Sequence, residues 1–216
     1  KINGIERIRL SSIEPTVIDE KFMKKAIEIK KLCDHFHLSL QSGSDTVLKR
    51  MNRKYTTTQY KEIVDLIRKY MPNAGITTDI IVGFPGETKE EFEETYNFVK
   101  DIGFSRIHVF KYSPRKGTPA SKFNNQIHGN IKHLRSEKII SLGYNLMDDF
   151  NEKFIGKTVE VLFEEENKAD PKFMEGYTTN YIRVKAEASE EIKGQILPVK
   201  IINKEKDILI GKIEEL

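Results

Sequence analysis

Segments typical of β-strands and of helices alternate along the first half of this chain, and this alternation limits its fold more than any other feature. Four short apolar or β-branched segments recur roughly 30–40 residues apart: Ile5–Leu10, His35–Leu40, Thr77–Val82 and Arg106–Tyr112. Since helical patterns stand between them, these segments predict parallel βα units. Right-handed crossovers then place the C-terminal ends of all four strands on one edge, where such sheets and barrels bind ligands.

The helices between these strands are indicated by apolar spacing and by start signals. Four residues at helical spacing predict a first helix that buries the cysteine: Phe22, Ala26, Ile29 and Cys33. A short helix is expected at Asp45–Met51. Two longer helices are expected to begin with capping boxes, in which a threonine stands three residues before a glutamine or glutamate: Thr56 with Gln59, and Thr88 with Glu91.

The chain changes character after residue 155. Residues 113–130 contain several Pro and Gly and predict a long loop, and a helix of about 25 residues then ends near Phe154. Beyond Gly156, four strand patterns follow without a helix: Thr158–Phe163, Tyr181–Ala186, Gly194–Ile202 and Ile208–Ile213. These patterns predict a small antiparallel β-barrel. We therefore expect two domains, an α/β domain over residues 1–155 and the barrel over residues 156–216.

The α/β part is expected to be incomplete, because four parallel strands cannot close a barrel. The chain begins at Lys1 rather than at a methionine, which is consistent with a missing N-terminal part. No apolar run approaches the roughly 20 residues of a membrane-spanning helix, so no membrane partner is expected. A single cysteine, Cys33, excludes an intrachain disulfide. We expect a cytoplasmic protein.

The charge is unevenly divided between the two parts. Residues 157–216 carry 10 Lys/Arg and 13 Asp/Glu, a net charge of −3, whereas residues 1–156 carry +6. A basic α/β part is compatible with a polyanionic partner and equally with an ordinary solvated surface.

Polar or glycine-rich residues follow each predicted strand, where a ligand-binding edge needs them: Ser11, Ser12 and Glu14; Gln41, Ser42 and Ser44; Gly83, Gly86 and Glu87; Tyr112, Ser113 and Arg115. Glycine-rich turns that lead into a helix can bind anionic groups through free backbone N–H groups. Each turn alone is also explained by the geometry of a βα loop. All four on one edge favour a binding site.

The same segments carry a family resemblance. Ser11-Ser12-Ile13-Glu14-Pro15, the run from Leu38 to Arg53, Asp79-Ile80-Ile81-Val82-Gly83-Phe84-Pro85-Gly86-Glu87-Thr88 and the run from Tyr112 to Ala120 resemble the radical-SAM methylthiotransferases in order and spacing. The trailing β-rich segment resembles the TRAM domain, an RNA-binding module of these enzymes. The resemblance implies a six-stranded partial TIM-like barrel, of which this chain holds the last four strands. It also implies S-adenosylmethionine and [4Fe–4S] clusters as cofactors of the full-length protein.

The resemblance implies a set of residues that contact S-adenosylmethionine: Ser12, Glu14, Ser39, Gln41, Ile81, Val82, Gly83, Phe110 and Tyr112, with Arg50 or Arg53 on its carboxylate. Arg115, Arg183 and Lys185 are the expected RNA contacts. No catalytic residue is assigned, and no metal ligand is expected in this chain, because a cluster needs several thiolates. Cys33 is expected to be structural, and the chain alone to be inactive.

The implied reaction inserts a methylthio group into a modified adenosine next to the anticodon of tRNA. Ser11-Ser12-Ile13-Glu14-Pro15 is most similar to the branch that acts on threonylcarbamoyl-adenosine. Three alternatives remain open: the branch that modifies a ribosomal protein, an RNA-binding module without catalysis, and an unrelated TIM-like enzyme. The last lacks support, since no metal-spaced His/Asp set and no nucleophile elbow occurs. The open edge of the incomplete barrel could also form a dimer. The sulfur and electron donors are unassigned.

Overall fold

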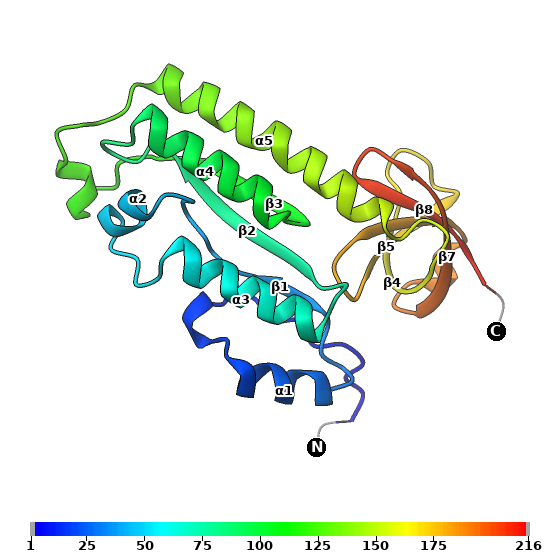
Figure 1. Cartoon of the computed structure of the whole chain (residues 1–216). Helices are drawn as coiled ribbons and strands as arrows, with labels where there is room; N and C mark the ends of the chain where they lie inside the picture. The colour runs from blue at the N-terminus through cyan, green and yellow to red at the C-terminus, as the bar shows by residue number, and fades with distance from the viewer. Residues whose placement is uncertain (1–2, 215–216) are drawn as a thin grey trace.

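A three-stranded parallel sheet forms the centre of the α/β part in the computed structural model, which describes residues 3–214. Its strands are ordered β1 (His35–His37), β2 (Gly75–Val82) and β3 (Arg106–Lys111). The helices are α1 (Glu20–Glu28), α2 (Asp45–Arg50), α3 (Thr57–Tyr70), α4 (Lys89–Ile102) and α5 (Gly129–Glu152), with short 3₁₀ turns at Pro15–Val17 and Pro119–Lys122. The predicted parallel α/β arrangement is confirmed (Figure 1).

Side-chain alternation gives the sheet two different faces. Leu38, Ile80 and Val82 are fully buried on the face that packs against the helices. The opposite face carries polar side chains, among them His37 and Asp79, whose Nε2 and Oδ2 atoms lie 3.1 Å apart. Because successive strand residues point to opposite faces, the sequence alternation sets this division.

The capping boxes fix where α3 and α4 begin. The Thr56 side chain accepts a hydrogen bond from the Gln59 N–H and the Thr88 side chain accepts one from the Glu91 N–H, and each Gln or Glu side chain accepts one in return. Both predicted boxes are confirmed. These reciprocal bonds satisfy backbone donors that a helix end otherwise leaves open.

The predicted strand at Ile5–Leu10 is wrong. This segment makes only an isolated parallel bridge between Ile8 and Leu32. Its alternating arginines contact the C-terminal barrel instead: the Arg7 guanidinium donates to the Tyr177 carbonyl at 2.8 Å, and the Arg9 guanidinium lies 3.9 Å above the Tyr181 ring. The strand-like alternation therefore serves a junction between the two parts of the chain.

The predicted first helix is too long. Helix α1 ends at Glu28, and Ile29 has left helical geometry with φ −91° and ψ 89°. Ile29 is exposed, whereas Cys33 is buried in the extended segment before β1, where its N–H donates to the Ile8 carbonyl at 2.8 Å. Burial raises the pKa of the Cys33 thiol. A buried thiol of raised pKa fits the structural role expected for Cys33.

Five strands form a closed barrel at the C-terminal end of the chain, in the order β4-β5-β6-β8-β7. Their bounds are β4 (Thr158–Glu166), β5 (Phe173–Thr178), β6 (Arg183–Glu187), β7 (Ile196–Glu205) and β8 (Ile208–Ile213), with a 3₁₀ turn at Glu190–Ile192. The predicted barrel is confirmed, with two differences. One of its pairs, β6 with β8, is parallel, and strand β5 was not predicted from the sequence.

Strand β5 escaped the sequence analysis because Glu175 and Gly176 interrupt its apolar alternation. The Glu175 carboxylate is buried and paired with Arg183, whose Nε donates to it at 2.6 Å. At Gly176, a Cβ atom would lie 2.1 Å from the Leu162 carbonyl oxygen. In β5, a glycine that allows close backbone approach and a glutamate in a buried ion pair stand where a strand usually has apolar residues.

The barrel lies at the edge of the sheet where the strands begin. The Asn180 amide donates to the Asn73 carbonyl at 2.9 Å, and the rings of His35 and Tyr181 are 4.9 Å apart between centroids. Arg106 at the start of β3 faces Asp207 at 4.0 Å. Figure 1 shows that the strands end at the far side of the sheet from the barrel. The carboxyl edge is therefore free of the barrel.

Within residues 3–214, the structure contains no helix with the length and apolar character needed to cross a membrane.

Candidate functional site

Backbone hydrogen bonds hold the ends of the three strands side by side. The N–H of Gln41 donates to the Asp79 carbonyl and the N–H of Ile81 donates to the Gln41 carbonyl, both at 2.8 Å. The N–H of Tyr112 donates to the Val82 carbonyl at 2.9 Å. The turns that carry the predicted site residues thus share one edge.

Gln41 has an unusual backbone conformation at this edge. Its φ of 68° lies in the left-handed region, and its side chain is 8% exposed. A non-glycine residue held in this conformation is uncommon and typical of a site whose surroundings force it.

A small cavity brings four of the predicted residues together. Ser12, Glu14, Ser39 and Arg53 line a space of about 170 Å³ with Tyr55. The Tyr55 hydroxyl donates to the Ser39 carbonyl at 2.7 Å and fixes one wall. Burial raises the Tyr55 pKa, while the charge of Arg53 opposes this and that of Glu14 adds to it. Both charges therefore act on the same buried hydroxyl.

The other predicted residues lie apart from this cavity. Val82 is fully buried in the helix-covered core, so its side chain does not face the site. Phe110, on the edge strand β3, is 52% exposed and lines a separate cavity of about 370 Å³ with Tyr144 of α5. Tyr112 packs edge-on against Phe84, with ring centroids 5.2 Å apart.

Ile81 and Gly83 continue β2 to the carboxyl edge. Ile81 is half-buried, one residue before the helix-facing Val82. Gly83 has φ +71°, and a Cβ atom there would lie 2.4 Å from Cγ of Lys132. The turn therefore requires glycine on both conformational and steric grounds.

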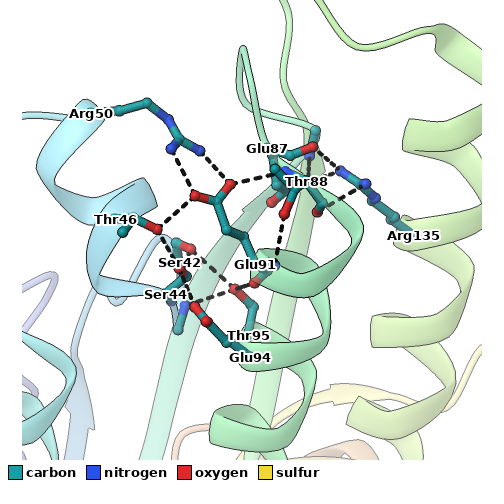
Figure 2. Close-up of polar contacts among 12 residues, drawn as sticks. Ser42, Ser44, Thr46, Arg50, Glu87, Thr88, Glu91, Glu94, Thr95 and Arg135 are labelled. Carbon is teal, nitrogen blue, oxygen red and sulfur yellow. Dashed lines mark hydrogen bonds and ion pairs between the residues drawn. The ribbon is translucent and has the colours of Figure 1, made fainter.

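Of the two arginines predicted as carboxylate ligands, Arg50 is already engaged. Its Nη1 and Nη2 atoms donate to the two carboxylate oxygens of Glu91 at 2.8 and 2.6 Å (Figure 2). Thr46 donates to the same carboxylate at 2.6 Å. This bidentate pair occupies the two terminal nitrogens with which Arg50 would bind a ligand carboxylate. Arg53, which lines the cavity, is therefore the arginine available to a ligand.

The Arg50–Glu91 pair should make stability depend on pH. Hydrogen bonding to Arg50 lowers the Glu91 pKa from 4.5 to about 2. A lowered folded pKa stabilises the fold above the unfolded value, and this stabilisation is lost as pH falls toward about 2. Urea unfolding of Glu91→Gln should give about 1–3 kcal/mol less stability than wild type at neutral pH. The gap should narrow in acid, and a constant gap would contradict this assignment.

A second ion pair holds the turn after β2. The Glu87 carboxylate has 1% exposure and accepts from the Gly83 N–H at 2.7 Å. Arg135 of α5 pairs with this carboxylate and also donates to the Glu87 and Thr88 carbonyls at 3.1 Å each (Figure 2). Burial outweighs these partners and raises the Glu87 pKa.

Sequence reasoning missed the parts played by Arg135 and Glu91. Glu91 was recognised only as the capping partner of Thr88. No local pattern marks Arg135, because its partner is 48 positions away along the chain.

The cavity suits one end of S-adenosylmethionine. Glu14 and Arg53 offer opposite charges to an ammonium and a carboxylate, and two serines supply hydroxyl groups. A volume of about 170 Å³ is below the roughly 300 Å³ of a pocket for a whole small ligand, so it fits the amino-acid end alone.

The residues of this chain do not fit an iron–sulfur cluster. Within residues 3–214, no group of three or more His, Cys, Asp or Glu side chains is placed to hold a metal ion. The only cysteine of the sequence, Cys33, is buried. A [4Fe–4S] cluster needs several thiolates.

Comparisons with known proteins show which proteins this chain is similar to. The sequence profile of the Radical SAM superfamily matches residues 1–99. The chain is 40% identical over 205 residues to the threonylcarbamoyladenosine tRNA methylthiotransferase MtaB of Bacillus subtilis (strain 168), covering 94% of this chain and 45% of that protein. It is 40% identical over 213 residues to the tRNA-2-methylthio-N(6)-dimethylallyladenosine synthase of Clostridium novyi (strain NT), covering 99% and 47%.

The chain thus spans about half the length of these curated relatives. Among solved structures, coproporphyrinogen III oxidase (HemN) from Escherichia coli, described as a radical SAM enzyme, aligns with a TM-score of 0.52. The alignment covers 69% of this chain and 34% of that one at 18% identity, and it supports the fold alone. By the profile match and the two curated relatives, the chain belongs to the radical-SAM methylthiotransferase family.

Proposed function

We propose that this chain is part of an enzyme that inserts a methylthio group into a modified adenosine next to the anticodon of tRNA, with threonylcarbamoyl-adenosine as the preferred base. One observation carries the proposal. Ser12, Glu14, Ser39 and Arg53 come from separate segments and line one cavity at the carboxyl edge of the sheet. Relatives named for tRNA methylthiolation support the reaction class.

Each cavity residue has a role in this proposal. Arg53 binds the carboxylate of S-adenosylmethionine, and Glu14 binds its ammonium group. Ser12 and Ser39 donate to ligand oxygens, while Gln41, Ile81, Gly83 and Tyr112 border the adenosyl end along the strand ends. S-adenosylmethionine, when bound in such enzymes, supplies the radical that activates a C–H bond. This chain's own residues bind and orient it.

The two parts of the chain divide this work. Residues 1–155 hold the cofactor, and residues 156–216 form a TRAM-like RNA-binding barrel in a cytoplasmic enzyme. The chain alone is inactive, because its single cysteine cannot ligate a cluster. Dimerisation through the exposed edge of the incomplete barrel stays a prediction.

Deletion of the gene in the source organism tests the reaction. Digested tRNA should lose its methylthiolated adenosine and accumulate the unmethylthiolated precursor, as measured by mass spectrometry of nucleosides. The precursor identifies the substrate: threonylcarbamoyl-adenosine for the branch proposed, dimethylallyl-adenosine for the other tRNA branch. The proposal would be refuted if the deletion left the tRNA nucleosides unchanged and a ribosomal protein instead lost the mass of a methylthio group. That result would favour the protein-modifying branch. Re-expression of the gene is the control.

A further inference from the structure

A long segment that ends the α/β part carries basic residues and no acidic ones. Between Asp101 and Glu137 the sequence contains no Asp or Glu, yet it contains seven basic residues: Arg106, Lys111, Arg115, Lys116, Lys122, Lys132 and Arg135. Such a run of one sign of charge is compatible with an anionic partner and with a solvated surface, so the placement of its cations decides between the two.

The middle of this segment crosses the carboxyl edge of the sheet. The loop is tied to β2 at its start by the Tyr112 N–H and Val82 carbonyl, and later by the Gly86 N–H, which donates to the Asn125 carbonyl at 2.7 Å. Lys132 Nζ donates to the Tyr112 carbonyl at 2.9 Å and closes the loop against α5. Figure 1 shows this loop at the end of the sheet remote from the barrel.

Most cations of the segment have no acidic partner in the part of the chain that the structure describes. Within residues 3–214, only Arg106 and Arg135 of the segment lie within 4.0 Å of a carboxylate. Arg115, Lys116 and Lys122 are exposed. These side chains therefore remain available to an external anion.

The barrel cations expected to contact RNA are in the opposite situation. Arg183 is paired with Glu175 and faces Asp207 at 4.0 Å, and Lys185 is 2.6 Å from Glu205. An anion would have to displace these carboxylates. Arg183 and Lys185 also lie on the barrel, at the edge of the sheet away from the cavity of Ser12 and Arg53.

A third cavity lies under the loop. It measures about 460 Å³ and is lined by Arg50, Gly86, Lys122, Phe123, Asn124 and Asn125. Phe123 is 39% exposed and rests edge-on against Phe84, with ring centroids 6.3 Å apart. Lysines neutralise phosphates, amides bond to base edges, and an exposed ring stacks on an unpaired base.

We propose that this loop, residues 111–125, is a cradle for single-stranded RNA beside the cofactor cavity. Arg115, Lys116 and Lys122 hold backbone phosphates, and an unpaired base stacks on Phe123 over the cavity beside Arg50. The proposal rests on the proposed function, since it assigns the surface that presents the substrate loop of tRNA.

Salt-dependent binding of a fluorescein-labelled anticodon stem-loop RNA to the 216-residue chain tests this cradle. The triple variant Arg115→Gln/Lys116→Gln/Lys122→Gln should bind at least about tenfold more weakly at physiological salt. Its slope of log affinity against log salt should fall by about 2, at roughly 0.7 for each single-strand phosphate contact. Phe123→Ala should weaken binding about tenfold without changing the slope.

A charge-matched triple variant provides the control. Lys61→Gln/Lys100→Gln/Lys138→Gln removes three lysines from α3, α4 and α5, two of them paired with Asp101 and Glu93, and should change affinity less than about twofold. Circular dichroism checks that each variant is folded. Equal losses in both triples, or a larger loss for Lys185→Gln than for the loop triple, would overturn the cradle.

The outcomes also separate this proposal from the proposed function. If wild type fails to bind the RNA while gene deletion still abolishes methylthiolation, the cradle falls and the enzyme assignment stands. If the loop binds RNA as expected but deletion leaves the tRNA nucleosides unchanged, the assignment of the reaction falls.

Discussion

Replacement of Arg135 by methionine should lower the free energy of unfolding by about 3–5 kcal/mol. The Glu87 carboxylate is 1% exposed, and Arg135, itself 11% exposed, is its charged partner. Methionine preserves most of the apolar packing but leaves the carboxylate buried and unpaired. A buried charge without a partner costs more than the ion pair gains, so the loss exceeds that of a surface pair.

Urea unfolding at neutral pH measures this loss, and Lys138→Met is the matched control. Lys138 stands on the same helix and pairs with Glu93, but the two side chains are 60% and 43% exposed. The control should change stability by less than about 1 kcal/mol. Equal losses for the two variants would contradict the buried role of Arg135.

The stability lost in Arg135→Met should also depend on pH. Burial raises the Glu87 pKa above its ordinary value of 4.5, and loss of Arg135 should raise it further. A group with a raised folded pKa favours the fold at low pH and opposes it as pH rises. The penalty of Arg135→Met should therefore shrink as pH falls from neutral toward 4.5, the ordinary value of the Glu87 carboxyl. The double variant Glu87→Gln/Arg135→Met should recover part of the loss at neutral pH.

Local signals predicted the elements well where the signal and its consequence lie within one segment. The capping boxes at Thr56 and Thr88 marked the starts of α3 and α4, because both partners lie within four residues. Ile5–Leu10 has the same alternation as a strand, yet Arg7 and Arg9 use it to contact the barrel. Whether such a segment becomes a strand of the sheet or a contact to the barrel depends on residues that are distant in the sequence.

The candidate site shows the same limit. Ser12 and Glu14 were expected at the carboxyl edge from the strand pattern. Ser39 and Arg53 were expected there only because the family resemblance implies it. Ile81 and Val82 could not both face a ligand, since strand residues alternate, and the structure buries Val82. Arg50 and Arg53 look alike in sequence, and only the pairing of Arg50 with Glu91 of α4 separates their roles.

Arg53→Ala should reduce kcat/KM of the complete enzyme by about 100-fold, mainly by raising the KM for S-adenosylmethionine. Removing a charge-assisted bidentate pair with a ligand carboxylate costs about 2–3 kcal/mol, which corresponds to a factor of roughly 30–150. Arg53 lines the same cavity as Ser12 and Glu14, whereas Arg50 is held by Glu91. Arg53→Lys should retain part of the affinity, because a point charge replaces the planar fork.

Lys54→Ala supplies the control for this effect, because it removes the adjacent positive charge without touching the cavity. Lys54 is exposed, and its Nζ reaches only the Asn52 side chain at 3.0 Å. Its removal should leave the KM for S-adenosylmethionine within about twofold of wild type. A general loss of positive charge would lower activity in both variants alike, whereas recognition of the carboxylate predicts a loss in Arg53→Ala alone. An unchanged KM in Arg53→Ala would place the amino-acid end of the cofactor elsewhere on this edge.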